Sequence, residues 1–341
     1  MNKKRSFAAI FGVALFVLLL GFFSRLTMPK YISVSREGNF ISEYYTEADR
    51  GNRHDVIFVG DCEAYSSIVP PLLWEKYGIK GFVRGSPSQT LAQSHALILD
   101  TLGYETPQAI VLSVYALCKE GTANEAYNRM TLDGMRLSSH KLRAVRESVG
   151  KGESVISYFI PLLRFHSRWS ELEREDLKYL FWRPAVSHNG YYMQKGVVAG
   201  EVEHSYESDA PHRLPQENLM RLSEIVGDCK ERGVELILFK APISSWRYPW
   251  YEEWDAEISD FADEHSVAYY SLVREAENIG IDLSCDSYDG GLHLNVNGAE
   301  KTTLCFGNLL ISNHKIYISR DRYAEEIWGE KVDKYYKEKN Q

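Results

Sequence analysis

Hydrophobic residues along the chain fall into two kinds of segment that alternate with each other. Short apolar runs of the kind that forms buried strands occupy residues 55–60, 78–83, 109–114, 234–239 and 267–271. Segments with apolar residues at helical spacing occupy residues 63–77, 89–102, 215–232, 255–265 and 298–311. Strands that alternate with helices are typical of a parallel sheet covered by helices on both faces. The pattern therefore predicts an α/β fold.

Three parts of the chain depart from this alternation. Residues 120–210 are the least regular, and we expect a helical insertion there. Pro70 and Pro71 should break or restart the helix predicted at 63–77, because proline removes a backbone hydrogen bond. The last residues, 326–341, are highly charged and are expected to fray as a tail behind a domain formed by residues 31–325.

The N-terminus carries a separate apolar segment. Three basic residues at positions 3–5 precede residues 7–23, which contain no charge. This length lies at the short end of the range for a membrane-spanning helix. Residues 24–29 make a poor signal-peptidase site, which favours an uncleaved anchor. By the positive-inside rule, we expect residues 1–30 to form a cytoplasmic stub and a single span in the cell membrane, with the remainder outside the cytoplasm.

The composition narrows the class of function. Hydrophobic residues make up 44% and charged residues 25% of the 341, which is ordinary for a globular protein and excludes a disordered or multi-span chain. The net charge is −8, so nucleic acid is not an expected partner, because binding phosphate requires a basic surface. Five cysteines without a C-x-x-C motif argue against a disulfide scaffold and a zinc site.

Residues with catalytic potential follow the predicted strands, where α/β proteins bind ligands. Residues 60–63, Gly-Asp-Cys-Glu, place a thiol on a turn between the first strand and a helix. Late in the chain, Asp286 and Asp289 precede His293, which gives a base and a carboxylate to orient it. Gly85 follows the second strand, where its backbone N–H could stabilise a developing oxyanion.

These segments resemble the motifs of the SGNH/GDSL hydrolase family. VIFVGDCE, at 56–63, is similar to the family's Gly-Asp-Ser block, and RGSPSQ, at 84–89, to the block that supplies an oxyanion glycine. DGGLHLN, at 289–295, is similar to the last block, Asp-x-x-His-Leu-Asn. The resemblance spans residues 54–312 and favours the membrane-anchored branch that acts on cell-envelope polymers. That branch includes teichoic-acid D-alanyl-transfer and exopolysaccharide acetyl-transfer proteins.

The resemblance implies a flavodoxin-like three-layer α/β/α sandwich and acyl transfer or ester hydrolysis without a metal or an organic cofactor. By position, Cys62 takes the place of the nucleophilic Ser, His293 that of the base and Asp289 that of its orienting acid. Gly85 and the backbone N–H of Cys62 take the places of the oxyanion hole. The implied partners are a cell-surface glycan or polymer as acyl acceptor and a membrane protein that exports acyl groups.

The sequence departs from the family pattern at three points. The nucleophile is Cys62 rather than Ser, flanked by acidic residues that disfavour a thiolate, whereas the helix N-terminus favours one. Asp289 lies four residues before His293 instead of three, so either Asp289 or Asp286 remains a candidate orienter. The family's Gly-x-Asn-Asp block is missing after residues 109–114, and a third oxyanion donor is unassigned. An inactive binding subunit of an envelope-assembly complex is the alternative to an enzyme.

Further residues are candidates for contact with substrate. His166 and Arg168 lie among aromatic residues and could bind an anionic acceptor or pack on the surface. Trp246 belongs to an aromatic cluster after the fourth strand, which could stack on sugars or form a packed loop. Lys240 could bind a phosphate or pair with an acid, and Asp61 is the last candidate.

Overall fold

A five-stranded parallel sheet in the order β2-β1-β3-β4-β5 forms the centre of the computed structural model, which describes residues 3–29, 40–121, 123–182, 184–199, 212–243 and 250–341. The strands are β1 (Val56–Gly60), β2 (Gly81–Gly85), β3 (Ala109–Ser113), β4 (Glu235–Lys240) and β5 (Ala268–Ser271). This is the doubly wound order of flavodoxin-like folds. The direction in which successive strands are added to the sheet reverses between β1 and β3. The predicted parallel α/β/α architecture is confirmed.

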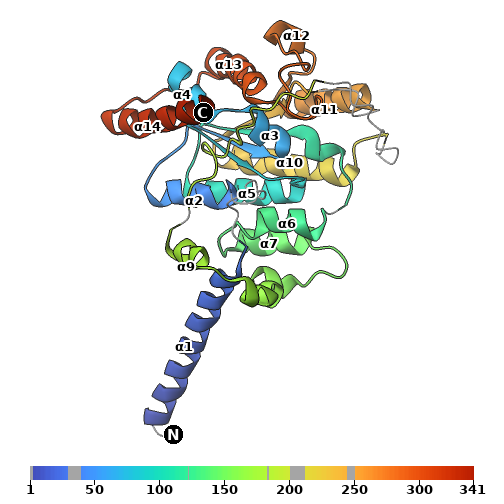
Figure 1. The fold of residues 1–341 in the computed structure, drawn as a ribbon. Helices are drawn as coiled ribbons and strands as arrows, with labels where there is room; N and C mark the ends of the chain where they lie inside the picture. Colours follow the sequence, from blue (N-terminus) through green and yellow to red (C-terminus); the bar gives the residue numbers. More distant parts are fainter. Residues whose placement is uncertain (1–2, 30–39, 122, 183, 200–211, 244–249) are drawn as a thin grey trace.

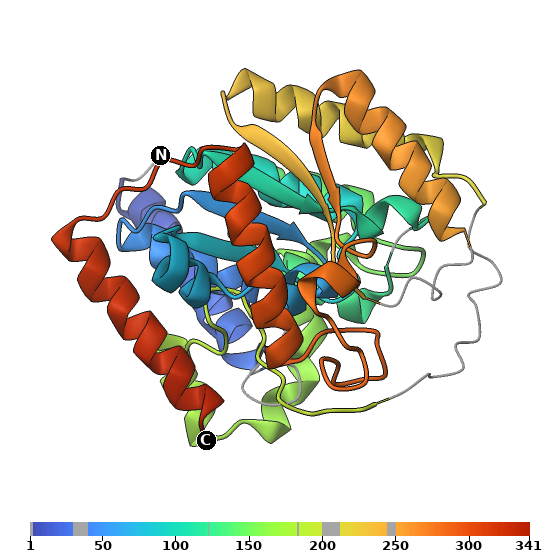
Figure 2. The same cartoon turned by 90° about the horizontal axis from the view of Figure 1, so that it is seen from above.

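Helices cover both faces of the sheet (Figures 1 and 2), and alternate residues of each strand pack toward opposite helical layers. Ile57 and Val59 pack toward α2 (Phe40–Asp49), α5 (Leu91–Tyr104), α10 (Gln216–Glu231) and α11 (Tyr251–His265). Val56 and Phe58 pack toward α3 (Cys62–Ser67), α4 (Pro70–Tyr77) and α13 (Val296–Asn313). The sheet is buried on both faces, which explains why its strands are continuously apolar in the sequence.

Element boundaries follow local chemistry. The helix predicted at 63–77 is two helices, because a new helix, α4, begins at Pro70. Proline is tolerated there because backbone N–H groups in the first turn of a helix have no intrahelical acceptor. Gly78 ends α4 in the left-handed conformation, so β2 starts three residues later than predicted. Between β3 and α10, helices occupy most of the described residues from 123 to 181. These helices are α6 (Glu125–Leu132), α7 (Ser139–Ser148), η3 (Val155–Tyr158), α8 (Leu162–Phe165), η4 (His166–Glu171) and α9 (Arg174–Phe181).

The charged C-terminal segment does not fray, and that prediction is wrong. Arg322–Lys339 form helix α14, which lies against α4 at the edge of the molecule (Figure 2). Trp328 stacks on Trp74 with ring centroids 5.7 Å apart, and the Tyr335 hydroxyl donates to Glu300 at 2.6 Å. Trp328 and Tyr335 lie seven residues apart, on one face of the helix, so they are buried while the charged residues cover the other faces.

The N-terminal segment forms one long helix, α1 (Lys3–Thr27), which projects from the domain (Figure 1). Ser6–Thr27 are long and apolar enough to cross a membrane, with a mean hydropathy of 2.5. Its side chains are exposed from Phe7 to Leu19.

A buried arginine organises the layer beneath β1 and β2. Arg84 is fully buried, and its guanidinium donates to Asp100 at 2.9 Å and to the Thr101 hydroxyl at 2.7 Å. It also lies over the rings of Tyr44 and Tyr45, 4.1 and 5.3 Å from their centroids. Since a buried cation is tolerated only with such partners, this network ties α2 and α5 to β2.

Asp100→Ala should therefore destabilise the protein strongly. It leaves the Arg84 guanidinium buried without its carboxylate, which we expect to cost about 3 kcal/mol. Thermal and urea unfolding of the full chain in detergent micelles measure the change. Arg164→Ala is the control, because Arg164 forms an exposed pair with Glu125 at 2.7 Å and its loss should cost less than about 1 kcal/mol. Equal effects from the two variants would contradict this account of Arg84.

Candidate active site

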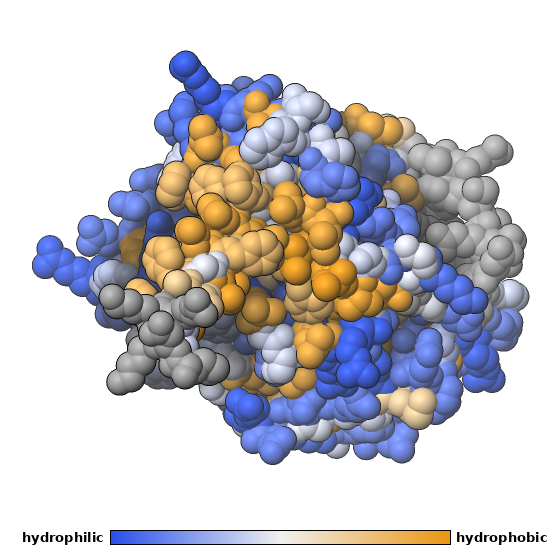
Figure 3. All heavy atoms as spheres, turned by 90° about the horizontal axis from the view of Figure 1, so that it is seen from below, coloured by the Kyte–Doolittle hydropathy of each residue, from blue (hydrophilic) through white to orange (hydrophobic). Residues whose placement is uncertain are grey.

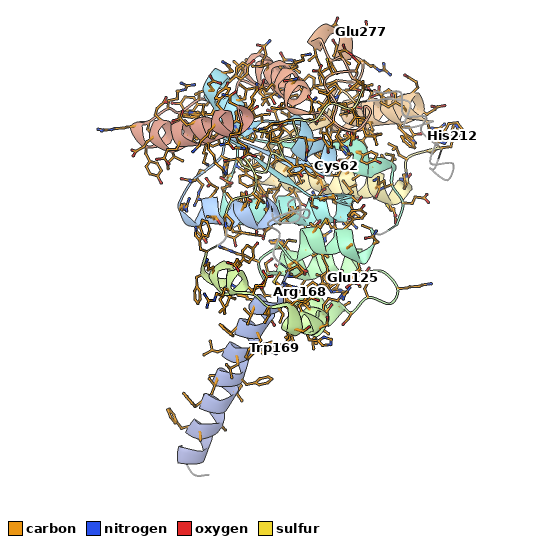
Figure 4. The ribbon with its side chains drawn as sticks, in the orientation of Figure 1. Cys62, Glu125, Arg168, Trp169, His212 and Glu277 are labelled. Atoms are coloured by element: carbon orange, nitrogen blue, oxygen red, sulfur yellow. The ribbon has the colours of Figure 1, made fainter. Side chains whose placement is uncertain are left out.

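Cys62 lies at the carboxyl end of the sheet, on the turn between β1 and α3 (Figure 4). The turn is tight, because a Cβ atom on Gly60 would come within 2.5 Å of the Ser113 Cβ atom in β3. Asp61 then caps α3, its carboxylate accepting the Glu63 N–H at 3.1 Å. Cys62 is half-buried at the first position of the helix, beside the switch point of the strand order between β1 and β3. Doubly wound proteins bind their ligands at this point.

Gly85 lies directly against this turn. It pairs with Gly60 across β1 and β2, and a Cβ atom on it would lie 3.0 Å from the Gly60 carbonyl oxygen. A larger residue would therefore push the two strand ends apart. The structure thus brings together the two backbone segments, at Cys62 and Gly85, that the sequence assigns to an oxyanion hole.

Asp289 contacts His293 despite the four-residue spacing. One carboxylate oxygen accepts the His293 backbone N–H at 2.8 Å, and the other lies 2.6 Å from Nδ1. Gly290 and Gly291, with φ of 73° and 90°, lie between them in a conformation that favours glycine. This turn brings the carboxylate back to the ring, so the extra residue does not separate the pair.

Neighbouring side chains hold the loop in this form. The Ser287 hydroxyl donates to the His293 carbonyl oxygen at 2.9 Å and accepts the Gly291 N–H at 2.7 Å. Asn295 caps α13 and donates to the Cys285 carbonyl oxygen at 2.8 Å. The other candidate orienter, Asp286, is buried and pairs with Lys301 at 2.6 Å, so its carboxylate is occupied away from the imidazole.

The contact with Asp289 selects one tautomer of the His293 ring. A carboxylate only accepts hydrogen bonds, so the ring donates its Nδ1–H to Asp289, and in the neutral imidazole Nε2 is the nitrogen that presents the lone pair. Nε2 is buried and has no hydrogen-bond partner among the residues that the structure describes. The Tyr288 ring stacks on the imidazole at 5.7 Å and limits its rotation. The side chain is therefore prepared to accept a proton at Nε2.

Helix packing joins the two halves of the site. α3 and α13 lie against each other. The Thr303 hydroxyl of α13 accepts a hydrogen bond of 2.9 Å from the backbone N–H of Val69, two residues after the end of α3. Cys62 packs against the same apolar cluster as Leu294, the residue after His293. α3 and α13 thus pack side by side on the same face of the sheet.

Beneath α3 lies a buried group of charges. Lys240, at the end of β4, pairs with Glu63 at 2.6 Å, and both side chains are almost inaccessible. Lys119, after β3, lies 4.1 Å from the centre of the Tyr115 ring. Burial works against its ammonium form, but the nearby Tyr115, Asp61 and Cys62 raise the pKa of Lys119. Two cations therefore accompany the two carboxylates that flank Cys62.

This arrangement corrects two candidates for substrate contact. Lys240 forms an ion pair in the interior, which was the alternative to binding a phosphate. Asp61 is also buried and serves as a helix cap. Lys119 was not predicted, although the sequence carries a signal for it: charged residues directly follow apolar strands at one edge of the sheet.

Arg168 does not lie near Cys62 (Figure 4), and its assignment to an acceptor site together with His166, two residues earlier in η4 (His166–Glu171), is wrong. The Arg168 guanidinium donates to the carbonyl oxygens of Thr27 and Met28 at 2.8 and 2.6 Å, where α1 leaves them unsatisfied. His166 begins η4 in the same part of the molecule. Trp246 lies outside the described residues.

The remaining aromatic residues and cysteines do not add to the site. Of the aromatic cluster after β4, Tyr251 and Trp254 are buried in the core against α10 and β5, as a packed segment. All five cysteines are free thiols. Among the residues that the structure describes, no group of three or more His, Cys, Asp and Glu side chains is arranged to hold a metal ion.

Burial and the charge of Glu63 raise the pKa of Asp61 to about 6. Because this folded-state pKa lies above the unfolded value, Asp61 favours the fold at low pH, and this contribution is lost as pH rises from about 4 to above 6. Asp61→Asn keeps the cap but removes the buried charge. The variant should gain up to about 3 kcal/mol relative to wild type between pH 4 and pH 8, or about 6 °C in Tm. Parallel Tm curves across this range would contradict the assignment.

The sequence matches no family model and no curated protein. Among solved structures, the chain is similar to a GDSL-like lipase from Bacteroides thetaiotaomicron, with 12% identity and a TM-score of 0.39 over 80% of this chain and 97% of the lipase. It is also similar to TesA, with 11% identity and a TM-score of 0.38 over 75% and 97% of the two chains. A third similar structure is AlinE4, an esterase of the SGNH-hydrolase family, with 13% identity and a TM-score of 0.30 over 76% and 96%.

Proposed function

We propose that this protein is a membrane-anchored enzyme of the SGNH/GDSL hydrolase type that transfers or hydrolyses an acyl ester, acetyl or similar, through Cys62, His293 and Asp289. The observation that carries the proposal is the Asp289–His293 pair, whose Nε2 has no hydrogen-bond partner among the described residues. The motif order in the sequence and the contact between α3 and α13 support the same assignment.

The reaction proceeds in two steps. The Cys62 sulfur attacks the carbonyl carbon of the acyl ester while its proton passes to His293 Nε2. The backbone N–H groups of Cys62 and Gly85 stabilise the tetrahedral oxyanion. When this intermediate collapses, the alcohol leaves with the proton from His293 and an acyl thioester remains on Cys62. A second hydroxyl, or water, then attacks the thioester with His293 again as base, which regenerates the thiol.

The acceptor in this proposal is a cell-surface glycan or polymer. α1 would hold the domain at the cell membrane, with the basic N-terminus in the cytoplasm and the domain outside. At that place the chemical groups available in quantity are the hydroxyls of envelope polymers. A membrane protein that exports acyl groups would supply the donor.

Acylation of the thiol tests the proposal directly. Full-length protein in detergent is exposed briefly to p-nitrophenyl acetate, and the intact mass is measured. We expect a single acetyl adduct that is absent in Cys62→Ala and forms about a hundredfold more slowly in His293→Ala, because the base is lost.

Cys285→Ser is the matched control for this experiment, because Cys285 is an exposed thiol outside the site. It should leave the adduct unchanged. An adduct spread over several cysteines and indifferent to His293 would overturn the catalytic assignment. The protein would then be better described as an inactive binding subunit. The presence of Cys62 where the family has its nucleophilic Ser is the observation that favours this alternative.

Asp289→Asn should slow acylation at neutral pH by at least about tenfold. An amide can donate to Nδ1, which moves the ring proton to Nε2 and blocks proton transfer from the thiol. The rate of adduct formation measures the effect. Asp282→Asn, an exposed change in the same loop, is the control and should leave the rate within about twofold. Equal rates in the two variants would show that Asp289 does not orient the base.

A further inference from the structure

Helix α1 joins the domain at the helical insertion. Its C-terminal part packs against α8, η4 and α9, and Leu26 and Thr27 are buried there. The Arg168 guanidinium caps its last carbonyl oxygens, as described above. The Phe23 and Trp169 rings meet edge to face with centroids 5.7 Å apart. The helix therefore leaves the domain through a packed joint.

Large apolar side chains surround this joint and face outward. We call six of them the collar, and they are exposed on the face from which α1 emerges: Ile156, Leu163, Trp169, Leu177, Phe181 and Trp182. Phe181 is 87% exposed and Trp182 70%. Figure 3 shows that face: hydrophobic residues lie at its centre, where α1 itself projects toward the viewer, and hydrophilic residues lie at the rim. Exposed apolar surface of this kind marks a binding surface rather than a solvated one.

The length of α1 identifies what covers the collar. Residues 6–22 are the part of the helix that is free of the domain, and about 17 residues rise about 26 Å. The hydrocarbon core of a bilayer is about 30 Å thick. A helix that spans this core therefore has no free length to hold the domain above the surface, and the collar must lie at the membrane interface.

The charges near the collar balance, so electrostatic attraction to anionic lipid does not explain this surface. Residues 164–182 contain four basic and four acidic residues, and several pair with each other, such as Lys178 with Glu175 at 3.6 Å. Anionic lipid gains nothing from such a balanced surface. Trp169 and Trp182 are of the residue type that accumulates at the boundary between headgroups and acyl chains.

We propose that the collar is a lipid-binding surface that lies in the interfacial region of the same bilayer that α1 spans. The collar side chains penetrate the boundary between headgroups and acyl chains on the side where the domain lies. This inference rests on the membrane anchoring in the proposed function and adds a second, monotopic contact to it.

Tryptophan quenching by brominated lipid tests the collar. The full chain is reconstituted into phosphatidylcholine vesicles with or without 6,7-dibrominated acyl chains. α1 contains no tryptophan, so quenching reports on the domain and not on the span. We expect brominated lipid to quench the emission of up to two of the seven tryptophans, Trp169 and Trp182. In Trp169→Phe/Trp182→Phe the quenched emission should fall by at least half.

Trp328→Phe is the matched control, because Trp328 is buried on α14 and its loss should leave the quenched emission unchanged. Flotation of the vesicles separates the two proposals. Protein that floats with the vesicles but is not quenched overturns the collar and leaves the anchor intact. Protein that does not float overturns both. Quenching that survives in the double variant also overturns the collar.

Discussion

The ion pair between Lys240 and Glu63 is the interaction on which the site depends. It joins the end of β4 to the first turn of α3 across the end of β3, inside the protein. A buried carboxylate is stable only beside such a partner, so Glu63 fixes the position of the turn that carries Cys62. Gly85 fits against that turn, and α13 packs against the helix that it begins. The position of the Cys62 turn is thus set by one buried contact.

The same contact changes the electrostatics of the thiol. In the sequence, the carboxylates on both sides of Cys62 oppose a thiolate. In the structure they point inward, where Lys240 and Lys119 accompany them, while the thiol remains at the helix N-terminus. Positive charge therefore accompanies the negative charge on both sides of Cys62, which the order of residues in the sequence does not reveal.

The strands and most helices could be predicted, because a sheet buried on both faces leaves continuous apolar runs in the sequence. The contact of Asp289 with His293 could not, since it depends on the turn at Gly290 and Gly291 rather than on residue spacing. Arg168 was misassigned because its partners lie 141 and 140 positions away, at the end of α1. α14 was missed because only a few apolar residues, on the face that packs, stand among its many charged residues.

The joint between α1 and the domain removes a freedom that a flexible linker would leave. A domain on a loose tether can tilt and turn to find its substrate. Here Arg168 and Trp169 hold the end of the helix against the insertion, so the domain and α1 move as one body. The edge of the sheet that carries Cys62 then keeps one orientation relative to the helix axis. For the acyl transfer proposed above, reach must then come from the substrate, which favours long, mobile polymers over small fixed ones.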